Sequence, residues 1–380
     1  MVADNAVRRW RRSLYVIFGW HGTLVGTWSS RIPWIIKQQH LEIQSFGLVA
    51  AGVGVGAVAS MPLAARFSHT CSARVVVWWL VGIGVTGLTV TAWAPGVPVL
   101  LFGLAALGVC LGTLDVIANA EGVALERAHG RPIMPGLHAA WSVGAVLASV
   151  GGAWAADDHL DTRTHFTVVA AVFAATSVLA SLGLPERTEH SDRTPLFRLP
   201  SRPTLTISLV AVGAEFASLA AADWSAEYLV RVTQAGAGVA VLAVTAALAT
   251  GAITRLIGDG LAYRFGAVRV VRISGVVASL GCLVVASART PVMGIAGFAL
   301  VGAGTGLVLP LACAAAGRTS PNSAQSIASV FTVVWIASIV EPGLLGHVAE
   351  LSSLPVAFVG VAVLCLVTAA GAGTLRLPTA

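Results

Sequence analysis

Residues 292–316 read VMGIAGFALVGAGTGLVLPLACAAA and contain no charged side chain. A helix needs about 20 mainly apolar residues to cross the hydrocarbon core of a bilayer, so this stretch is long enough to span a membrane. The rest of the chain has the same character, because 56% of its residues are hydrophobic, 11% are charged and the mean hydropathy is +0.84. A water-soluble chain carries about a quarter of charged residues. The composition therefore predicts an all-α integral membrane protein.

Similar apolar stretches lie on both sides of this one, separated by segments rich in Pro, Gly, Arg or Asp. The polar stretch 185–203 is the longest separator, and joined halves of this kind are common in transporters. We therefore expect an N-terminal six-helix bundle (1–184), a cytoplasmic linker (185–203) and a C-terminal six-helix bundle (204–380). The predicted spans are residues 14–36, 46–67, 75–94, 97–121, 132–155, 166–184, 204–229, 236–257, 269–288, 292–316, 324–348 and 354–375.

The two predicted halves resemble each other in sequence. Three matches occur in order at nearly constant offset, as expected for a duplicated transporter fold with parallel repeats. They are TWSSR at 27–31 with DWSAE at 223–227, LAARF at 63–67 with LAYRF at 261–265, and Trp141 with Trp335.

The basic residues predict the orientation in the membrane, because Lys and Arg favour cytoplasmic loops. If the N-terminus is cytoplasmic, 18 of the 23 basic residues fall on that side and 5 on the other. We therefore expect both termini in the cytoplasm of a bacterium, with residues 14–36 as the first span and not a signal peptide. The same distribution explains the net charge of +6 without a nucleic-acid partner.

Residues 258–266, GDGLAYRFG, resemble the loop motif between spans 8 and 9 of the major facilitator superfamily. WSSRIP at 28–33, DVIANAEG at 115–122 and DWS at 223–225 resemble a bacterial branch related to the fucose–proton symporters. The likeness covers essentially the whole chain. It implies two pseudo-symmetric bundles that rock around a central cavity, lined chiefly by spans 1, 4, 7 and 10.

The sequence departs from the fucose symporters where those proteins couple protons. They use an acid in span 1 and another in span 4, whereas span 1 of this chain has His21 and Arg31 but no carboxylate. Asp115 in span 4 is the candidate equivalent of the second acid. The first-half loop motif, residues 62–74, also lacks its acidic residue.

Charged side chains at membrane depth are candidates for function, because each costs about 2.5–3.5 kcal/mol even on the lenient insertion scale. We predict that Glu215, Glu341 and Asp115 carry proton coupling, in that order, since burial favours the neutral form of a carboxyl group. Structural alternatives stay open. Asp115 could hold loop arginines, and Glu215 and Glu341 could form buried structural pairs.

Other polar and aromatic residues predict a cavity and a latch. Tryptophan rings inside the spans suit stacking against a sugar or a drug, although helix packing would use them equally well. The expected substrate-cavity residues are His21, Trp28, Asn119, His138, Trp141, Asp223, Trp224 and Trp335. We expect Asp259, Arg264 and Arg66 to form a cytoplasmic latch, meaning contacts that hold one transport state and break in the other.

Aligning the halves also predicts an outer gate. Arg31 aligns with Glu227 and Thr27 with Asp223, so Arg31 is expected to pair with Glu227 or Asp223 in the inward-open state. In the alternative interpretation, Arg31 extends along the helix to the outer surface.

These features predict a secondary active transporter that moves a small solute, sugar-like or a drug or metabolite, by alternating access with proton coupling. No G-x-x-x-x-G-K-[ST], H-E-x-x-H or G-x-S-x-G motif occurs, so we expect neither ATP as fuel nor enzymatic activity, and no metal or cofactor. The expected partners are the solute, protons and the lipid bilayer, with the protein acting as a monomer. Two alternatives stay open: a receptor or assembly protein on a transporter fold, and an integral membrane enzyme.

The topology can be tested with reporter fusions. Fusions after Arg198 and after Ala380 are both expected to report the cytoplasm, and a fusion near Asp158 the outside, because of the 18-to-5 split of basic residues. Fusions at Arg198 and Ala380 that fall on opposite faces would contradict the even number of spans.

Overall fold

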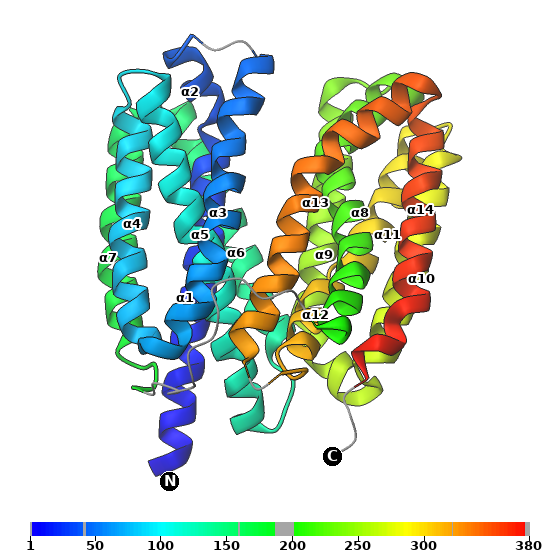
Figure 1. Cartoon of the computed structure of the whole chain (residues 1–380). Helices are drawn as coiled ribbons and strands as arrows, with labels where there is room; N and C mark the ends of the chain where they lie inside the picture. The colour runs from blue at the N-terminus through cyan, green and yellow to red at the C-terminus, as the bar shows by residue number, and fades with distance from the viewer. Residues whose placement is uncertain (1, 41–42, 159, 187–200, 321, 377–380) are drawn as a thin grey trace. The chain divides into compact units, whose positions relative to one another are not determined.

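The computed structural model describes residues 2–40, 43–158, 160–186, 201–320 and 322–376, and all regular structure in these ranges is helical (Figure 1). The predicted linker, 185–203, lies mostly outside the described residues. In chain order the helices are α1 (Val2–Ser30), α2 (Ile32–Gln38), α3 (Ile43–Thr70), α4 (Ala73–Trp93), α5 (Val97–His129), α6 (Met134–Asp157), α7 (Thr162–Ser181), α8 (Arg202–Thr233), α9 (Ala237–Phe265), α10 (Ala267–Ala286), α11 (Pro291–Thr305), α12 (Val308–Ala316), α13 (Ser323–Leu351), α14 (Leu354–Gly371) and the 3-10 helix η1 (Ala372–Leu375).

Contacts divide the chain into two compact units. The first unit comprises Met1–Gly130 and Ala140–Leu199, and the second comprises Arg131–Ala139 and Pro200–Ala380. The start of α6 thus belongs to the second unit and the rest of α6 to the first. The division into bundles 1–184 and 204–380 stays a prediction.

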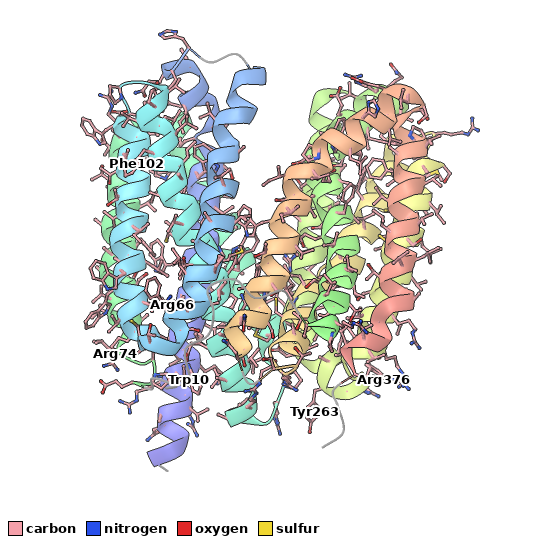
Figure 2. The ribbon with its side chains drawn as sticks, viewed as in Figure 1. Trp10, Arg66, Arg74, Phe102, Tyr263 and Arg376 are labelled. Atoms are coloured by element: carbon pink, nitrogen blue, oxygen red, sulfur yellow. The ribbon has the colours of Figure 1, made fainter. Side chains whose placement is uncertain are left out.

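The helices confirm the predicted all-α membrane class. Every predicted span coincides with helical structure, and nine helical segments of the described chain are long and apolar enough to cross a membrane. Their exposed faces are apolar, with side chains such as Trp79, Phe102 and Leu147 more than 60% exposed. Such faces are stable only against lipid. Phe102 can be seen projecting from the ribbon in Figure 2.

Two predicted spans are broken, because proline cannot donate the backbone hydrogen bond that a helix needs. The first span is divided at Arg31 into α1 and α2, and α2 has a proline in its first turn. The span predicted at 292–316 is divided between Thr305 and Val308 into α11 and α12. Pro310 explains this second break, because its ring would collide with the carbonyl of Gly306 in a continuous helix.

The motif GDGLAYRFG is not a loop in the structure. Helix α9 continues through it to Phe265, eight residues beyond the end predicted at 257, and the chain turns only at Gly266 with φ of 77°. Two glycines in the helix cost only about 1 kcal/mol each relative to alanine, and no proline stops it. Helix α5 likewise extends past the predicted residue 121 to His129 and ends at Gly130, with φ of 71°.

An aromatic cluster holds the core of the second unit together. The rings of Tyr228 (α8), Phe298 (α11) and Phe358 (α14) meet edge to face, with centroids 5.4–5.9 Å apart. The hydroxyl of Tyr228 donates a hydrogen bond of 2.5 Å to the carbonyl of Val285 in α10. One tyrosine therefore connects four helices.

In the first unit, glycines allow α1 and α6 to cross closely. A Cβ atom added at Gly144 would lie 2.0 Å from the carbonyl oxygen of Gly19, and one added at Gly22 would lie 1.9 Å from that of Trp141. Backbone contact of this kind is a typical way for membrane helices to pack. It brings the middle of α6 against the polar segment of α1.

Replacing Gly144 tests this crossing. Gly144→Ala is expected to lower the free energy of unfolding by about 1–3 kcal/mol, because the helices must separate. Gly151→Ala is a matched control on the same helix, since nothing lies within 4 Å of the added atom. Thermal unfolding of the purified protein in detergent measures both. Equal stability of the two variants would contradict the close crossing.

Candidate functional site

A polar cluster lies inside the first unit, where α1, α5 and α6 meet. The Nδ1 atom of His21 lies 3.6 Å from Oδ1 of Asp115, and the two side chains are 7% and 10% exposed. The ring of His21 meets that of Trp141 edge on, with centroids 6.2 Å apart. Asn119 follows one turn after Asp115 and donates to its backbone carbonyl at 2.8 Å. The structure thus brings together four residues that the sequence predicted separately.

The pair of His21 and Asp115 can hold one proton between them. An imidazole and a carboxylate at this distance form an ion pair when the histidine is protonated, and a neutral pair when the carboxyl group takes the proton instead. Span 1 therefore contributes a titratable group to the acid of span 4 although it has no carboxylate of its own. Arg131, an arginine in the loop after α5, lies over the ring of Tyr263 at 5.5 Å.

Glu341 on α13 is a fully buried acid of the second unit. The residue is 0% exposed, and within the described chain neither carboxylate oxygen has a hydrogen-bond partner. The charge that acts on it is a like one, from Asp223 on α8. Buried carboxylates normally have a cation or hydrogen-bond donors. An acid in such surroundings is expected to have a functional role.

Glu215 on α8 has a partner of opposite charge. Its carboxylate interacts electrostatically with the guanidinium of Arg255, which belongs to α9. The Nε atom of Arg255 also donates at 3.1 Å to the carbonyl of Gly306. That carbonyl is the one that Pro310 leaves without its helical donor. Arg255 therefore connects Glu215 to the break between α11 and α12.

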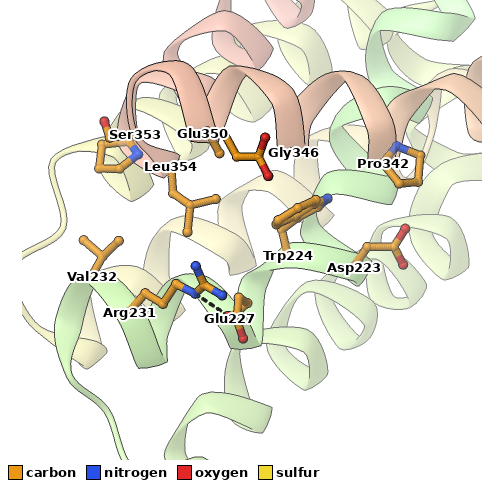
Figure 3. Close-up of a pocket in the computed structure, with 12 residues that line it drawn as sticks. Asp223, Trp224, Glu227, Arg231, Val232, Pro342, Gly346, Glu350, Ser353 and Leu354 are labelled. Atoms are coloured by element: carbon orange, nitrogen blue, oxygen red, sulfur yellow. Dashed lines mark hydrogen bonds and ion pairs between the residues drawn. The ribbon is translucent and has the colours of Figure 1, made fainter. Parts of the chain in front are cut away.

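A pocket of about 770 Å³ opens among α8, α13 and α14 (Figure 3). Two predicted cavity residues, Asp223 and Trp224, contribute to its wall. The Nε1 atom of Trp224 is buried without a hydrogen-bond partner among the described residues. The other lining residues are Glu227, Arg231, Val232, Pro342, Gly346, Ala349, Glu350, Ser353, Leu354 and Pro355.

The two sides of the predicted outer gate have partners within their own units. Arg31 is only 4% exposed, and it donates to Nδ1 of His165 and to the carbonyl of Leu160, both at 3.2 Å. Arg31 thus extends to the segment between α6 and α7 and is buried there. Glu227 forms an ion pair with Arg231 one helical turn away. Pairing of Arg31 with Glu227 or Asp223 stays a prediction.

Asp259, the acid of the predicted latch, contacts a helix end. Its Oδ1 accepts a 2.8 Å hydrogen bond from the backbone N–H of Gly136, in the first turn of α6. Backbone N–H groups in a first turn have no partner in their own helix, and a negative charge is favourable there. Arg264 lies over the neighbouring ring of Phe265, and Arg66 is exposed on α3 (Figure 2). The latch itself stays a prediction.

The remaining predicted cavity residues are placed on three helices. Trp28 is buried in α1, and Trp335 is half-buried in α13. His138 is half-buried near the start of α6. Their role in binding a solute stays a prediction. The sequence analysis missed His165, Leu160 and Arg255, because these partners come from other helices and no local pattern connects them.

Comparison with known proteins places the chain among transporters. No protein-family model matches it. It is 34% identical over 348 residues to an uncharacterised transporter of Sinorhizobium fredii, covering 89% of this chain and 90% of that protein. It is 27% identical over 357 residues to an uncharacterised MFS-type transporter of Yersinia pestis, covering 92% of each. A solved major facilitator transporter, FucP in the outward conformation, matches the fold with a TM-score of 0.81 and 17% identity, covering 96% of this chain and 98% of that one.

A double-mutant cycle tests the contact between His21 and Asp115. His21→Gln and Asp115→Asn are each expected to lower the free energy of unfolding. The double variant is expected to lower it by less than the sum of the two single effects. An interaction energy of about 0.5–3 kcal/mol is typical of residues in contact. Thermal unfolding measures it without a substrate. The control cycle combines His21→Gln with Thr176→Ala, whose exposed hydroxyl bonds only its own helix. Additive effects in both cycles would mean that the two residues do not interact.

Proposed function

The chain belongs to the major facilitator superfamily of membrane transporters, and from that premise we propose that it couples the movement of a small solute to protons. It is a multi-pass membrane protein whose relatives in Sinorhizobium and Yersinia are bacterial transporters. One of the solved proteins with the same fold is a fucose:proton symporter of Escherichia coli. That similarity alone supports only the fold, so the proton coupling is argued from the residues of this chain.

The observation that carries the proposal is the isolation of Glu341. A charged carboxylate without donors or a cation is costly in an apolar interior, so this site is stable when Glu341 holds a proton. The negative charge of Asp223 acts in the same direction, because like charges disfavour each other. When the transporter changes conformation and water reaches the side chain, hydration stabilises the charged carboxylate and the proton leaves. Alternating access exposes such a group to the two sides in turn.

The same reasoning changes the order of the candidate proton carriers. Burial of Glu215 favours its neutral form, as it does for Glu341, but Arg255 supplies an opposing positive charge that Glu341 lacks among the described residues. We therefore place Glu341 first, the pair of Asp115 and His21 second, and Glu215 third. The two leading sites lie in different units, one in each.

For the solute, we propose a sugar-like compound that binds beside Asp223 and Trp224. A carboxylate accepts hydrogen bonds from hydroxyl groups, and Asp223 is exposed in the wall of the pocket. The indole face provides an apolar surface for a ring. A drug or another metabolite is the second candidate.

Neutralising Glu341 tests the proposal. A thermal-shift screen of the purified protein against sugars, nucleosides, amino acids and antibiotics first identifies a solute that stabilises it. Glu341→Gln is then expected to reduce solute-driven proton movement in proteoliposomes at least tenfold, while solute exchange and the thermal shift persist. A pH-sensitive dye inside the vesicles reports the protons. Asp158→Asn, an exposed acid at the end of α6, is the control and should behave like the unmodified protein.

The other outcomes are equally informative. Normal proton movement in Glu341→Gln together with its loss in Asp115→Asn would transfer the role to the first unit. Normal movement in the Glu341, Asp115 and Glu215 variants would remove all three from the mechanism. A solute that stabilises the protein but never crosses the vesicle membrane would favour a receptor.

A further inference from the structure

A second pocket, of about 440 Å³, lies where α9 ends, α10 begins and the chain leaves η1. Three arginines line it, and no acidic residue does. Figure 2 labels one of them, Arg376, near the end of the described chain. The lining residues are Phe265, Gly266, Ala267, Val268, Arg269, Arg272, Leu375 and Arg376.

The positive charge of this pocket has no counterpart in the described part of the chain. Arg269, Arg272 and Arg376 are all exposed, and the ion pairs found there involve other residues. The first turn of α10 has no acidic residue, and its N-cap, Gly266, offers no side-chain acceptor. A helix N-terminus is itself partly positive, so two arginines in the first two turns increase the repulsion. An anion between the three guanidinium groups would relieve it.

The surface next to the pocket is apolar and continues along two helices. On α10, Ile273, Val276 and Leu280 follow the arginines at steps of three or four residues and are 57%, 41% and 53% exposed. On α14, Val363 and Val367 are 54% and 56% exposed. The two helices pack closely, because a Cβ added at Gly275 would lie 2.7 Å from the carbonyl oxygen of Cys365. In Figure 1, α14 (red) lies in front of α10.

We propose that this pocket binds the phosphate headgroup of an anionic phospholipid, with the acyl chains against the apolar stripes of α10 and α14. Arginine suits a phosphate because its planar guanidinium group can donate two parallel hydrogen bonds. The predicted topology places the pocket on the cytoplasmic side, where anionic lipids attract basic residues. The stripes favour a lipid over a soluble phosphate, which would use only the arginines.

The experiment compares lipids on the purified full chain in detergent. Phosphatidylglycerol is expected to raise the unfolding temperature more than phosphatidylcholine, and native mass spectrometry should show it bound. The triple variant Arg269→Gln, Arg272→Gln, Arg376→Gln should lose at least tenfold in apparent affinity for phosphatidylglycerol. The control variant Arg9→Gln, Arg12→Gln, Arg202→Gln removes three exposed arginines of the same predicted side and should stay within twofold.

Three results would overturn the proposal. They are unchanged protection in the pocket variant, an equal loss in the control variant, and equal protection by inorganic phosphate, which would indicate an ion site without lipid. If the triple variant does not fold, the three single variants replace it. Each single variant should lose at least threefold in apparent affinity for phosphatidylglycerol. Wild-type affinity in all three would also overturn the lipid site.

Discussion

The constraint on which this structure depends is that no polar group can be left without a partner in hydrocarbon. It explains why all regular structure in the described chain is helical, since a helix satisfies its own backbone. It also explains how the chain tolerates a break at Pro310. The carbonyl of Gly306 loses its helical donor there. It accepts a hydrogen bond from the Nε–H group of Arg255 instead. A side chain from α9 thereby replaces the missing backbone donor between α11 and α12.

Three of the charged side chains inside the predicted spans follow the same constraint. His21 meets Asp115, Arg31 meets His165 and the carbonyl of Leu160, and Glu215 is matched by Arg255. Each of these pairs joins two or more segments of one unit, so each also orients helices. Glu341 alone among these acids is buried without a hydrogen-bond partner in the described chain. A buried acid with neither carboxylate oxygen hydrogen-bonded is expected to have a functional role.

The sequence was sufficient for the membrane class and for the approximate position of every span, because apolar stretches of this length have few other uses. It was less informative about helix ends. Helix α9 continues through residues 258–265 although two of them are glycines, which lower the stability of a helix. A hydropathy pattern does not measure this helix propensity, so it does not predict where the helix ends. The breaks at Arg31 and Gly306 were within reach, since Pro33 and Pro310 mark them in the sequence.

The individual site residues were recognisable in the sequence, but their interaction partners were not. An intramembrane acid is visible in a sequence, whereas its partner is set by which helices touch. Asp115 and His21 were both noted, and only the fold joins them. The sequence predicts Glu215 as the first candidate, and the positive charge of Arg255 from α9 is the reason for proposing it third. The depth of Glu341 was predictable from its span, but its lack of hydrogen-bond donors required coordinates.

The bond between Arg31 and His165 has a consequence for how the chain is made. The two residues are 134 positions apart, so α1 is synthesised long before its partner on α7 exists. At about 5–20 residues per second, the interval is roughly 7–27 s. During that time an arginine at the end of α1 without this partner costs up to about 2.5–3.5 kcal/mol in lipid. The free energy of Arg31 in the membrane therefore falls only when the last helix of the first unit is in place.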